Sequence, residues 1–249
     1  MKTVCVYNFK GGSMKSTVTT TLAAGLSEQG NRVLVIDTDP QGHATMMLGL
    51  SPEPALYDLL VRNAPLSDAI RQSGSGVYCI PGNDETSLIP MKMSNPLLLR
   101  QMLDRLDSLF DLCIIDTSPT PNLFSAVIYY ASDYVLYPTK CEALHIDGLQ
   151  RAIEQKRQVD IMRTNNQIAR IRTLGIIPAI YRGKTLEHRE YHRALQAEYP
   201  GEVWAPVPQS IVWAEASRNQ QPVFQYAPET GAASAAWNMI HTFQERIGA

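Results

Sequence analysis

The sequence predicts an α/β fold, in which a mostly parallel, twisted sheet is covered by helices on both faces. Short apolar runs rich in β-branched residues recur along the chain, as expected of parallel strands that are buried on both faces. Intervals with the apolar spacing of helices separate these runs. The first run also leads through a glycine-bearing loop straight into a helical pattern. Alternation of this kind is typical of sheets built from strand–helix–strand units.

The first 37 residues predict a strand, a loop, a helix and a second strand. The β-rich run at 3–8 is followed by the loop FKGGSMKST, and the helical spacing of 16–31 stops near Gly30. The run RVLVID at 32–37 is nearly all apolar and ends in an acid, which predicts a strand buried on both faces.

Further strands and helices complete the predicted sheet. Apolar runs predict strands at 77–82, 111–116, 134–139 and 173–180. Residues 95–110 predict an amphipathic helix whose apolar side is formed by Leu99, Met102, Leu103, Leu106 and Phe110. Helices also fit the intervals 123–132, 142–164, 185–198 and 231–247. No internal repeat or Pro/Ser-rich linker interrupts this alternation, so we expect one domain over residues 1–249.

The composition is that of an ordinary globular protein. The 249 residues include 22 Lys and Arg against 24 Asp and Glu, a net charge of −2, which excludes a histone-like or acidic-tail protein. The first residues form an apolar stretch too short for a signal peptide, and no run approaches the roughly 18 apolar residues of a membrane span. We therefore expect a cytoplasmic protein whose four cysteines, which lack CxxC spacing, are reduced thiols.

The loop after the first strand has the features of a phosphate-binding loop. Such a loop needs glycines whose backbone N–H groups point at the anion, a Lys for the β and γ phosphates and a Ser or Thr hydroxyl for Mg²⁺. Gly11, Gly12, Lys15, Ser16 and Thr17 stand in that order between a strand and a helix. The strict pattern GxxxxGK[ST] fails twice, because its two glycine positions hold Phe9 and Met14.

The pattern that does fit is KGGxxK[ST], in which Lys10 precedes the two glycines. It resembles the deviant Walker A motif of the ParA/MinD superfamily of ATPases. Four further segments resemble the same superfamily and follow in its order: VLVIDTDPQGHAT at 33–45, FDLCIIDTSPT at 110–120, PTKCEALHIDGL at 138–149 and PVPQSIVWAEASRNQQPVFQYAPETGAASAAW at 206–237. The resemblance spans nearly the whole chain and implies a P-loop NTPase-like fold.

The resemblance implies an ATP hydrolase that uses ATP and Mg²⁺, with slow, partner-stimulated turnover. Lys15 would hold the β and γ phosphates, and Thr17 would donate to the α phosphate. Lys10 would reach across a dimer to the partner's ATP, which makes hydrolysis depend on dimerisation. The implied nucleotide-binding residues are Lys10, Gly11, Gly12, Ser13, Met14, Lys15, Ser16 and Thr17, with Pro206, Val207 and Pro208 in a loop beside the adenine.

Acidic residues complete the site that the resemblance implies. Asp39 would orient or activate the attacking water. The implied catalytic residues are therefore Lys10, Lys15 and Asp39. Ser16 would ligate Mg²⁺, while Asp37 and Asp116 would support the ion through bound water. Because these two acids end apolar strands, where an unpaired buried carboxylate costs roughly several kcal/mol, a cation partner is expected beside them.

Met14 departs from the superfamily pattern, which has glycine immediately before the phosphate-binding lysine. Glycine allows positive φ and a close approach of the backbone to phosphate, whereas another residue in that conformation costs about 1 to 3 kcal/mol. The loop is therefore expected either to adopt a variant geometry or to bind and hydrolyse ATP less well. Gln209 and Val212 also stand where many relatives have Arg.

Charge is unevenly distributed along the chain. Residues 151–193 contain ten Lys or Arg against four acids, a net +6, whereas the rest of the chain has twelve against twenty, a net −8. This asymmetry is expected of a protein that binds the DNA backbone without sequence preference, and a homodimer doubles it. The candidate DNA-binding residues are Arg182, Lys184, Arg189, Arg193 and Arg218. Ordinary solvated helices carry similar charge, and this alternative stays open.

The predicted function is that of a ParA-like ATPase that dimerises on ATP, binds non-specific DNA and is released by hydrolysis. It would position a plasmid, a chromosome locus or a protein organelle over the nucleoid, with a ParB-like or cargo adaptor protein and without a membrane. An alternative is a nucleotide-locked DNA-binding scaffold with little turnover, which Met14 would favour.

A membrane positioner and an iron–sulfur reductase component each have sequence requirements that this chain does not meet. A MinD-like membrane positioner would need a basic amphipathic C-terminal helix, but the tail WNMIHTFQERIGA has one Arg and no Lys. An iron protein of nitrogenase-like reductases would bridge an iron–sulfur cluster with cysteines from each subunit. Cys79, Cys113 and Cys141 lack the glycine-rich contexts of that family.

Overall fold

The computed structural model describes residues 1–93 and 95–248. Within them, one sheet of seven strands has the order β3-β4-β2-β5-β1-β6-β7. Every neighbouring pair is parallel except β3 and β4. The expected α/β fold class is therefore confirmed. The strands are β1 (Lys2–Val6), β2 (Val33–Asp37), β3 (Arg71–Gln72), β4 (Tyr78–Ile80), β5 (Leu112–Asp116), β6 (Tyr134–Lys140) and β7 (Arg172–Ala179).

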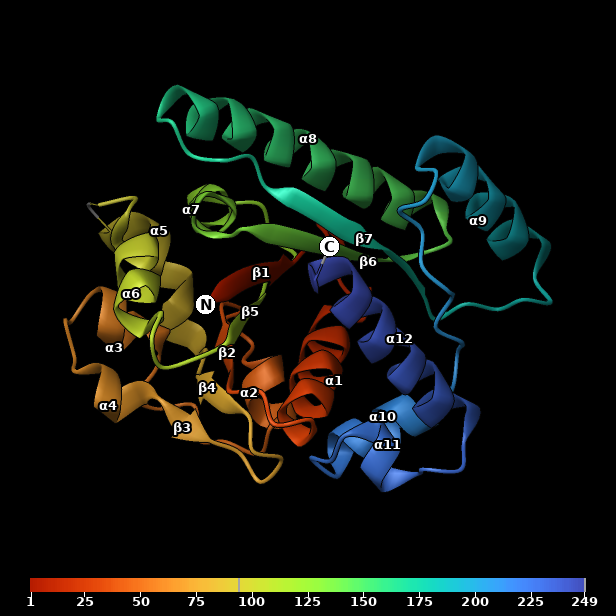
Figure 1. Ribbon diagram of the computed structural model, residues 1–249, viewed down its shortest axis with the longest axis horizontal. Helices are drawn as coiled ribbons and strands as arrows, with labels where there is room; N and C mark the ends of the chain where they lie inside the picture. Colours follow the sequence, from red (N-terminus) through yellow and green to blue (C-terminus); the bar gives the residue numbers. More distant parts are fainter. Residues whose placement is uncertain (94, 249) are drawn as a thin grey trace.

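Helices cover both faces of this sheet, with α7 and α8 over one face and α1 and α12 over the other (Figure 1). The longer helices are α1 (Lys15–Glu28), α6 (Leu98–Leu106), α7 (Leu123–Ala131), α8 (Ala143–Asn165), α9 (Leu186–Glu198) and α12 (Gly231–Gly248). The shorter ones are α2 (His43–Met47), α3 (Leu56–Leu60), α4 (Leu66–Ala69), the 3₁₀ helix η1 (Asp84–Leu88), α5 (Ile89–Lys92), α10 (Val212–Arg218) and α11 (Val223–Tyr226).

Two apolar cores lie on the two faces of the sheet, because side chains alternate along each strand. Cys5 of β1 and Tyr7 just after it belong to the core that α6, α7 and α8 cover. Val4 and Val6 belong to the core beneath α1 and α12. Strands β2 and β5 are buried along their whole length. The continuous apolar runs in the sequence are explained by this burial on both faces.

The central position of β1 places its carboxyl end beside two acidic strand ends. Val6 pairs with Asp116 of β5, and Asp37 of β2 pairs with the same residue. The loop that leaves β1 therefore begins next to two carboxylates. Crevices at the carboxyl ends of parallel strands are the usual ligand-binding positions of such sheets, so this edge is where a functional site is expected.

Most predicted elements are present with shifted ends. The helix predicted at 95–110 is the shorter α6, which buries the expected Leu99, Met102, Leu103 and Leu106. The strand predicted at 77–82 is β4 and contains only three residues. The short helices between residues 43 and 92, and α11, have no counterpart in the sequence prediction. Segments of four or five residues are too short to show a helical period.

The helix lengths and the burial of the cysteines concern two alternatives considered above, a membrane positioner and an iron–sulfur reductase component. Among the described residues, no helix is long and apolar enough to cross a membrane. All four cysteines are free and buried, and burial raises the pKa of Cys5 to about 12. Because the thiolate is the form that binds metal, these buried thiols give no support to an iron–sulfur cluster shared between subunits.

Arg163 of α8 has a structural role that its charge alone does not reveal. The side chain is only 2% exposed. Its guanidinium donates to the carbonyls of Tyr129 and Tyr130 at 3.2 and 3.0 Å, and to that of Ser132. These carbonyls belong to the last turn and end of α7, where backbone acceptors lack partners within the helix. Arg163 therefore fastens α8 to α7 and is unavailable to a nucleic acid.

Replacing Arg163 by Met keeps the apolar stem but removes the guanidinium that donates to the carbonyls of Tyr130 and Ser132, while the carbonyl of Tyr129 keeps the backbone N–H of Ser132. Arg163→Met is expected to lower the free energy of unfolding by about 3 kcal/mol, because each unsatisfied buried polar group costs roughly 1 to 3 kcal/mol. Urea denaturation followed by circular dichroism measures the change. The matched control is Arg157→Met on the exposed side of the same helix, where a small effect is expected. Equal effects of the two substitutions would contradict the assigned role.

Candidate functional site

The loop between β1 and α1 turns sharply and leaves the start of α1 open. Gly12 adopts a φ of 70°, and Ser13 Oγ donates to the carbonyl of Lys10 at 3.1 Å. Gly11 and Gly12 are exposed. Among the described residues, no side chain caps the first turn of α1, so its backbone N–H groups remain available. An uncapped helix N-terminus after a glycine loop is a ready anion site, because its N–H groups and dipole favour negative charge.

Met14 occupies the left-handed conformation that glycine usually supplies. Its φ is 67° and its ψ is 22°, directly before α1. The side chain is half-buried and packs against the core beneath α1 and α12. At this one position the backbone therefore has the geometry that glycine usually supplies, and the expected effect on ATP binding and hydrolysis stays a prediction. Holding Met14 in this conformation costs about 1 to 3 kcal/mol in backbone strain.

Lys15 lies at the bottom of a cavity formed by the loop. Its side chain is buried, and its ammonium donates to the carbonyl of Lys10 at 3.2 Å. Burial lowers the pKa of Lys15, while the nearby Asp116 and Asp39 oppose that shift. The cavity has a volume of about 470 Å³, enough for a small-molecule ligand. Its lining includes all residues from Gly11 to Thr17, and Asp39, Gln41, Ser118, Thr120 and Ser217.

Asp116 connects the sheet to the start of α1. One carboxylate oxygen accepts a hydrogen bond from Ser16 Oγ at 2.6 Å, and the other accepts from Thr19 Oγ1 at 3.2 Å. The residue is completely buried, and burial together with the neighbouring Asp37 raises its pKa. A serine hydroxyl backed by a carboxylate supplies the oxygen donors that Mg²⁺ prefers. Ser16, which lines the cavity, and Asp116 behind it would therefore fit a magnesium ion.

Asp37 has a different set of partners. Its oxygens accept from the backbone N–H of Asp39 at 3.1 Å, and from the backbone N–H and hydroxyl of Thr45, both at 2.8 Å. Burial raises its pKa. These bonds fix the segment from Asp39 to Thr45, which includes part of the cavity wall. The structure thus shows Asp37 as an organiser of this segment, and its support of a magnesium shell stays a prediction.

Asp39 reaches the cavity itself. It is 7% exposed, and one carboxylate oxygen accepts from the backbone N–H of Gln41 at 3.0 Å. It lines the same cavity as Lys15 and Ser16. An acid opposite a phosphate-type loop can orient a water molecule, which is the geometry that its predicted role requires.

The predicted adenine-side loop lies outside this cavity. Val207 is buried and donates its N–H to the carbonyl of Pro178, and Pro208 forms a bridge with Tyr181. Residues 206–208 thus run alongside the end of β7, and none of them lines the cavity. Adenine binding by Pro206, Val207 and Pro208 therefore stays a prediction. Ser217 of α10, which was not predicted from the sequence, is part of the cavity wall.

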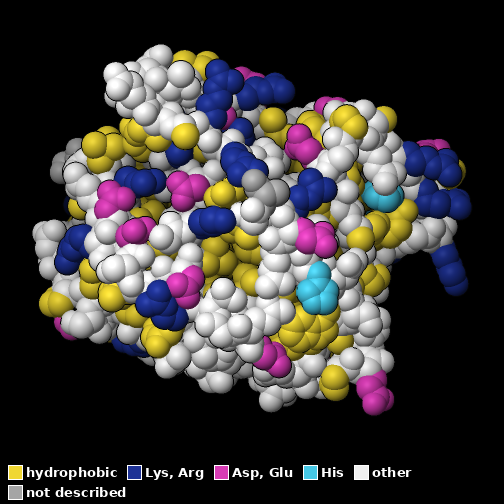
Figure 2. Space-filling model, viewed as in Figure 1, with side chains coloured by type: hydrophobic (Ala, Val, Ile, Leu, Met, Phe, Trp, Pro, Cys, Tyr) yellow, Lys and Arg dark blue, Asp and Glu magenta, His cyan; other side chains and the backbone are white. Residues whose placement is uncertain are grey.

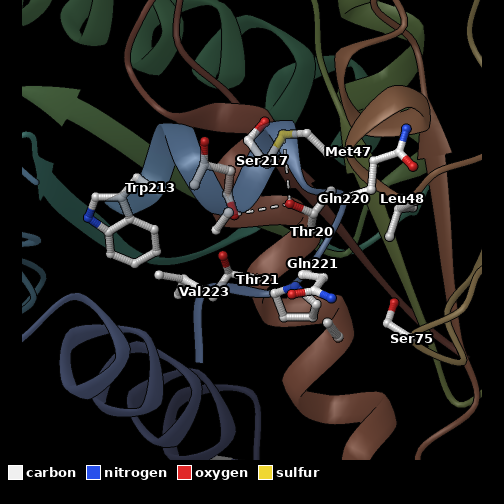
Figure 3. Close-up of a pocket in the computed structure, with 14 residues that line it drawn as sticks. Thr20, Thr21, Met47, Leu48, Ser75, Trp213, Ser217, Gln220, Gln221 and Val223 are labelled. Carbon is white, nitrogen blue, oxygen red and sulfur yellow. Dashed lines mark hydrogen bonds between the residues drawn. The ribbon is translucent and has the colours of Figure 1, made fainter. Parts of the chain in front are cut away.

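A second, small cavity continues from the first between α1, α2 and α10. Figure 3 shows Thr20 and Thr21 on one side and Trp213 and Ser217 on the other. The two cavities share Thr17, Met47 and Ser217. The small one holds about 20 Å³, room for one water molecule rather than a nucleobase. It is a packing gap beside the site.

His145 contacts the phosphate loop from outside the cavity and Glu142 contacts His145, and the sequence reasoning missed both. His145 Nε2 lies 3.3 Å from the carbonyl of Gly11, and its Nδ1 lies 3.5 Å from Glu142 Oε2. The other oxygen of Glu142 pairs with Arg182 at 3.2 Å. Burial lowers the pKa of His145. Both residues start α8 directly after β6, the strand beside β1, and this adjacency was the available clue.

The candidate DNA-binding residues fall into two groups. Arg182, Lys184, Arg189 and Arg193 are exposed and lie on α9 or in the segment before it; we call them the α9 basic surface. Figure 2 shows Lys and Arg side chains gathered over α9 at the right edge. Arg218 is also exposed but ends α10, which Figure 1 places beside α11 and α12, apart from α9.

The net charge of residues 151–193 overstates the free basic surface. Arg163 is buried, and Lys156 pairs with Asp160 at 2.8 Å. Arg157 pairs with Glu154 within the same helix. Lys184, Arg189 and Arg193, by contrast, have no ion pair among the residues described. Among the described residues of this segment, the exposed charges without an ion pair are thus those of Lys184, Arg189 and Arg193 on the α9 basic surface, together with Arg170 and Arg172 at the start of β7.

Comparisons with known proteins agree with this arrangement. The family described as an AAA domain matches residues 1–170. The chromosome-partitioning ATPase Soj of Thermus thermophilus is 28% identical over 249 residues, which cover 99% of this chain and 97% of Soj. The structure of apo McdA from Cyanothece has a TM-score of 0.84 at 23% identity and covers 100% of both chains. Cobyrinic acid a,c-diamide synthase from Mycobacterium smegmatis, solved with bound ADP and magnesium, has a TM-score of 0.75 at 28% identity over 88% of this chain and 91% of that one.

A parallel sheet whose first strand leads through a lysine-bearing glycine loop into an uncapped helix defines a P-loop nucleoside triphosphatase. The chain belongs to the AAA-domain family that matches its first 170 residues. Within that family it is a ParA/MinD-type ATPase, of the group that includes partition and positioning proteins.

The strain at Met14 predicts an unusual order of stability for two substitutions. At ordinary positions, alanine is more stabilising than glycine because it restricts the unfolded chain. At a φ of 67° the order is expected to reverse, with Met14→Gly more stable than Met14→Ala by about 1 kcal/mol, since only glycine relieves the strain. Thermal denaturation of both variants measures the difference. A more stable Ala variant would show that the loop is relaxed at this position.

His188 predicts a pH dependence of stability. Its side chain is fully buried, and burial, with Arg182 next to it, lowers its pKa. The unfolded chain therefore takes up a proton near pH 6.5 while the folded protein resists it, so the stability that His188 contributes is lost as the pH falls below about 6.5.

The destabilisation caused by His188→Gln is accordingly expected to shrink between about pH 7.5 and 5.5, since glutamine does not titrate. Urea denaturation of the wild type and the variant at both pH values measures it. The exposed His43 provides the control substitution, whose effect should stay constant. If His188→Gln instead destabilised the protein more at the lower pH, the folded protein would bind the proton more tightly than the unfolded chain.

Proposed function

We propose that this protein is a ParA-like ATPase that dimerises on ATP, holds non-specific DNA and releases it after hydrolysis. One observation carries the proposal: contacts join the phosphate loop to the α9 basic surface. Gly11 contacts His145, His145 faces Glu142, and Glu142 pairs with Arg182. A change in the loop on nucleotide binding would therefore be transmitted to a surface suited to DNA.

The geometry of the cavity supports the assigned roles in ATP binding and hydrolysis. In this proposal Lys15 and the N–H groups from Gly11 to Thr17 hold the phosphates, with Thr17 at the α phosphate. Ser16 ligates Mg²⁺ and Asp116 supports it. Asp39 orients the attacking water. Phosphoryl transfer depends mostly on positioning and neutralisation of charge, which lysine and Mg²⁺ supply together.

Exposed apolar side chains around the cavity support a homodimer. Met46 of the cavity wall is 53% exposed, Leu144 beside His145 is 67% exposed, and Leu123 at the start of α7 is 75% exposed. Gly11 and Gly12 are exposed on the same loop. A second copy docked over this edge would cover these side chains, and it would bring Lys10 of each subunit toward the ATP of the other.

The α9 basic surface supports DNA binding without sequence preference. Arg189 and Arg193 are four residues apart and so lie on one side of α9. Arginine and lysine bind phosphate oxygens, and the attraction to the DNA backbone falls with salt. A dimer would present two such surfaces. Arg218 is not part of this surface, and its contact with DNA remains a separate prediction.

The relatives support the proposed cellular role. Soj is a chromosome-partitioning ATPase, and a further relative, PomZ of Myxococcus xanthus, is a cell division protein. In our proposal residues 1–249 form one ATPase domain in the cytoplasm, associated with the nucleoid. A ParB-like or cargo adaptor protein stimulates hydrolysis, and the cargo is a plasmid, a chromosome locus or a protein organelle. The membrane has no part in the cycle.

The test is binding of a labelled random-sequence DNA duplex, measured by fluorescence anisotropy with Mg²⁺ and no nucleotide, ADP or ATP. Binding is expected only with ATP, and Lys15→Ala should abolish it. Arg189→Ala/Arg193→Ala should weaken it about tenfold or more, because a dimer loses four phosphate contacts. The matched control is Lys92→Ala/Arg105→Ala, on exposed parts of α5 and α6, which should change affinity less than about twofold.

Three results would contradict the proposal. Equal affinity with and without ATP would show that the cavity does not control DNA binding. Equal losses from the two double variants would mean that general positive charge, rather than the α9 basic surface, attracts DNA. ATP-dependent DNA binding without phosphate release would instead favour the nucleotide-locked DNA-binding scaffold.

A further inference from the structure

A glycine inside α8 allows that helix to touch the loop after β1. Gly148 is buried in the first half of α8. A Cβ atom at this position would lie 2.7 Å from Lys10 Cγ, 2.8 Å from Asn8 Oδ1 and 3.4 Å from the Lys10 backbone nitrogen. Glycine is unfavourable in the interior of a helix. Its presence here provides the space in which the stem of Lys10 rests on the helix backbone.

Asn8 holds the same lysine from the other side. It is completely buried, and its Nδ2 donates to the carbonyl of Pro138 at 2.9 Å. Its Oδ1 accepts the backbone N–H of Lys10 at 3.0 Å. The side chain of Asn8 thus ties the start of the loop to β6. Because both ends of the amide are bonded, Asn8 cannot move away from an added group at position 148.

The contact continues along one side of α8. His145 precedes Gly148 by three residues, so the two lie on the same side of the helix. His145 Nε2 lies 3.3 Å from the carbonyl of Gly11, the residue after Lys10. Gly148 thus contacts Lys10, and His145 contacts Gly11. The first turns of α8 therefore support two successive residues of the loop.

We propose that Gly148 and Asn8 are positioning residues for Lys10. Lysine has a long, flexible side chain, and holding its stem restricts the directions in which the ammonium can point. Gly148 fixes the Cγ atom and Asn8 fixes the backbone, so that Lys10 leaves the loop in one direction. The inference rests on the proposed role of Lys10 in hydrolysis across a dimer, and it names the two residues on which that role depends.

The test compares Gly148→Ala, Lys10→Ala and the double variant with the wild type. The readouts are kcat for ATP hydrolysis, the affinity for Mg²⁺·ADP and thermal stability. Gly148→Ala is expected to lower kcat about tenfold or more and to leave ADP affinity within about twofold, because small displacements of a reacting group have large effects on rate. In the Lys10→Ala background the same change should cause no further loss of kcat. Gly231→Ala, at a glycine with open space around it in α12, is the matched control.

Stability provides a second, independent readout of the contact. Lys10→Ala removes the Cγ atom, so the double variant is expected to melt at a higher temperature than Gly148→Ala alone. If Gly148→Ala does not fold, recovery of folding in the double variant reports the same contact.

Three results would overturn the inference: an unchanged kcat in Gly148→Ala, losses of kcat that multiply in the double variant, or no recovery of stability on shortening Lys10. Full activity of Lys10→Ala would instead refute the proposed role of Lys10 itself. The two failures are therefore distinguishable.

Discussion

Two adjacent buried carboxylates, at the ends of β2 and β5, are the constraint on which the rest of the site depends. Asp37 and Asp116 lie opposite each other in the register of these two parallel strands, and both are completely buried. Because burial removes them from water, each carboxylate must accept hydrogen bonds or have its charge neutralised. Asp37 takes its donors from Asp39 and Thr45, and Asp116 takes them from Ser16 and Thr19. Satisfying the two charges therefore fixes both the wall of the cavity and the first turn of α1, while the nearby ammonium of Lys15 opposes the remaining repulsion.

The loop opposite these acids shows that function can retain an unfavourable conformation. Met14 is left-handed, and the surrounding elements hold it there, with β1 before it, α1 after it and the core beside its side chain. Backbone strain persists only when its surroundings impose it. Lys15 and Ser16 follow directly in the first turn of α1, so the strained residue lies beside residues that line the cavity. The strict motif fails at Met14, although the backbone there has the conformation that glycine usually supplies.

The sequence predicted the parts of this protein that depend on local patterns or on strand ends. Continuous apolar runs identified β2 and β5, and the family resemblance placed their final acids at the same site as Lys15 and Ser16. Contacts between segments far apart in the chain were not predictable in this way. Arg163 was counted as surface charge, because nothing local shows that it bonds carbonyls at the end of α7. Nothing local in the sequence indicates the contact of His145 with Gly11, because it joins residues more than a hundred positions apart.

The central place of β1 has a consequence for how the chain folds during synthesis. Strand β1 is made first, yet its two neighbours, β5 and β6, begin only at Leu112 and Tyr134. Until those strands have left the ribosome, Lys2–Val6 has no partner, and the loop after it has neither the carboxylate of Asp116 nor the support of α8. Pairings between distant segments form slowly and late. An incomplete chain thus holds all the residues of the loop but no assembled site, and the capacity to bind a nucleotide arises only when most of the protein exists.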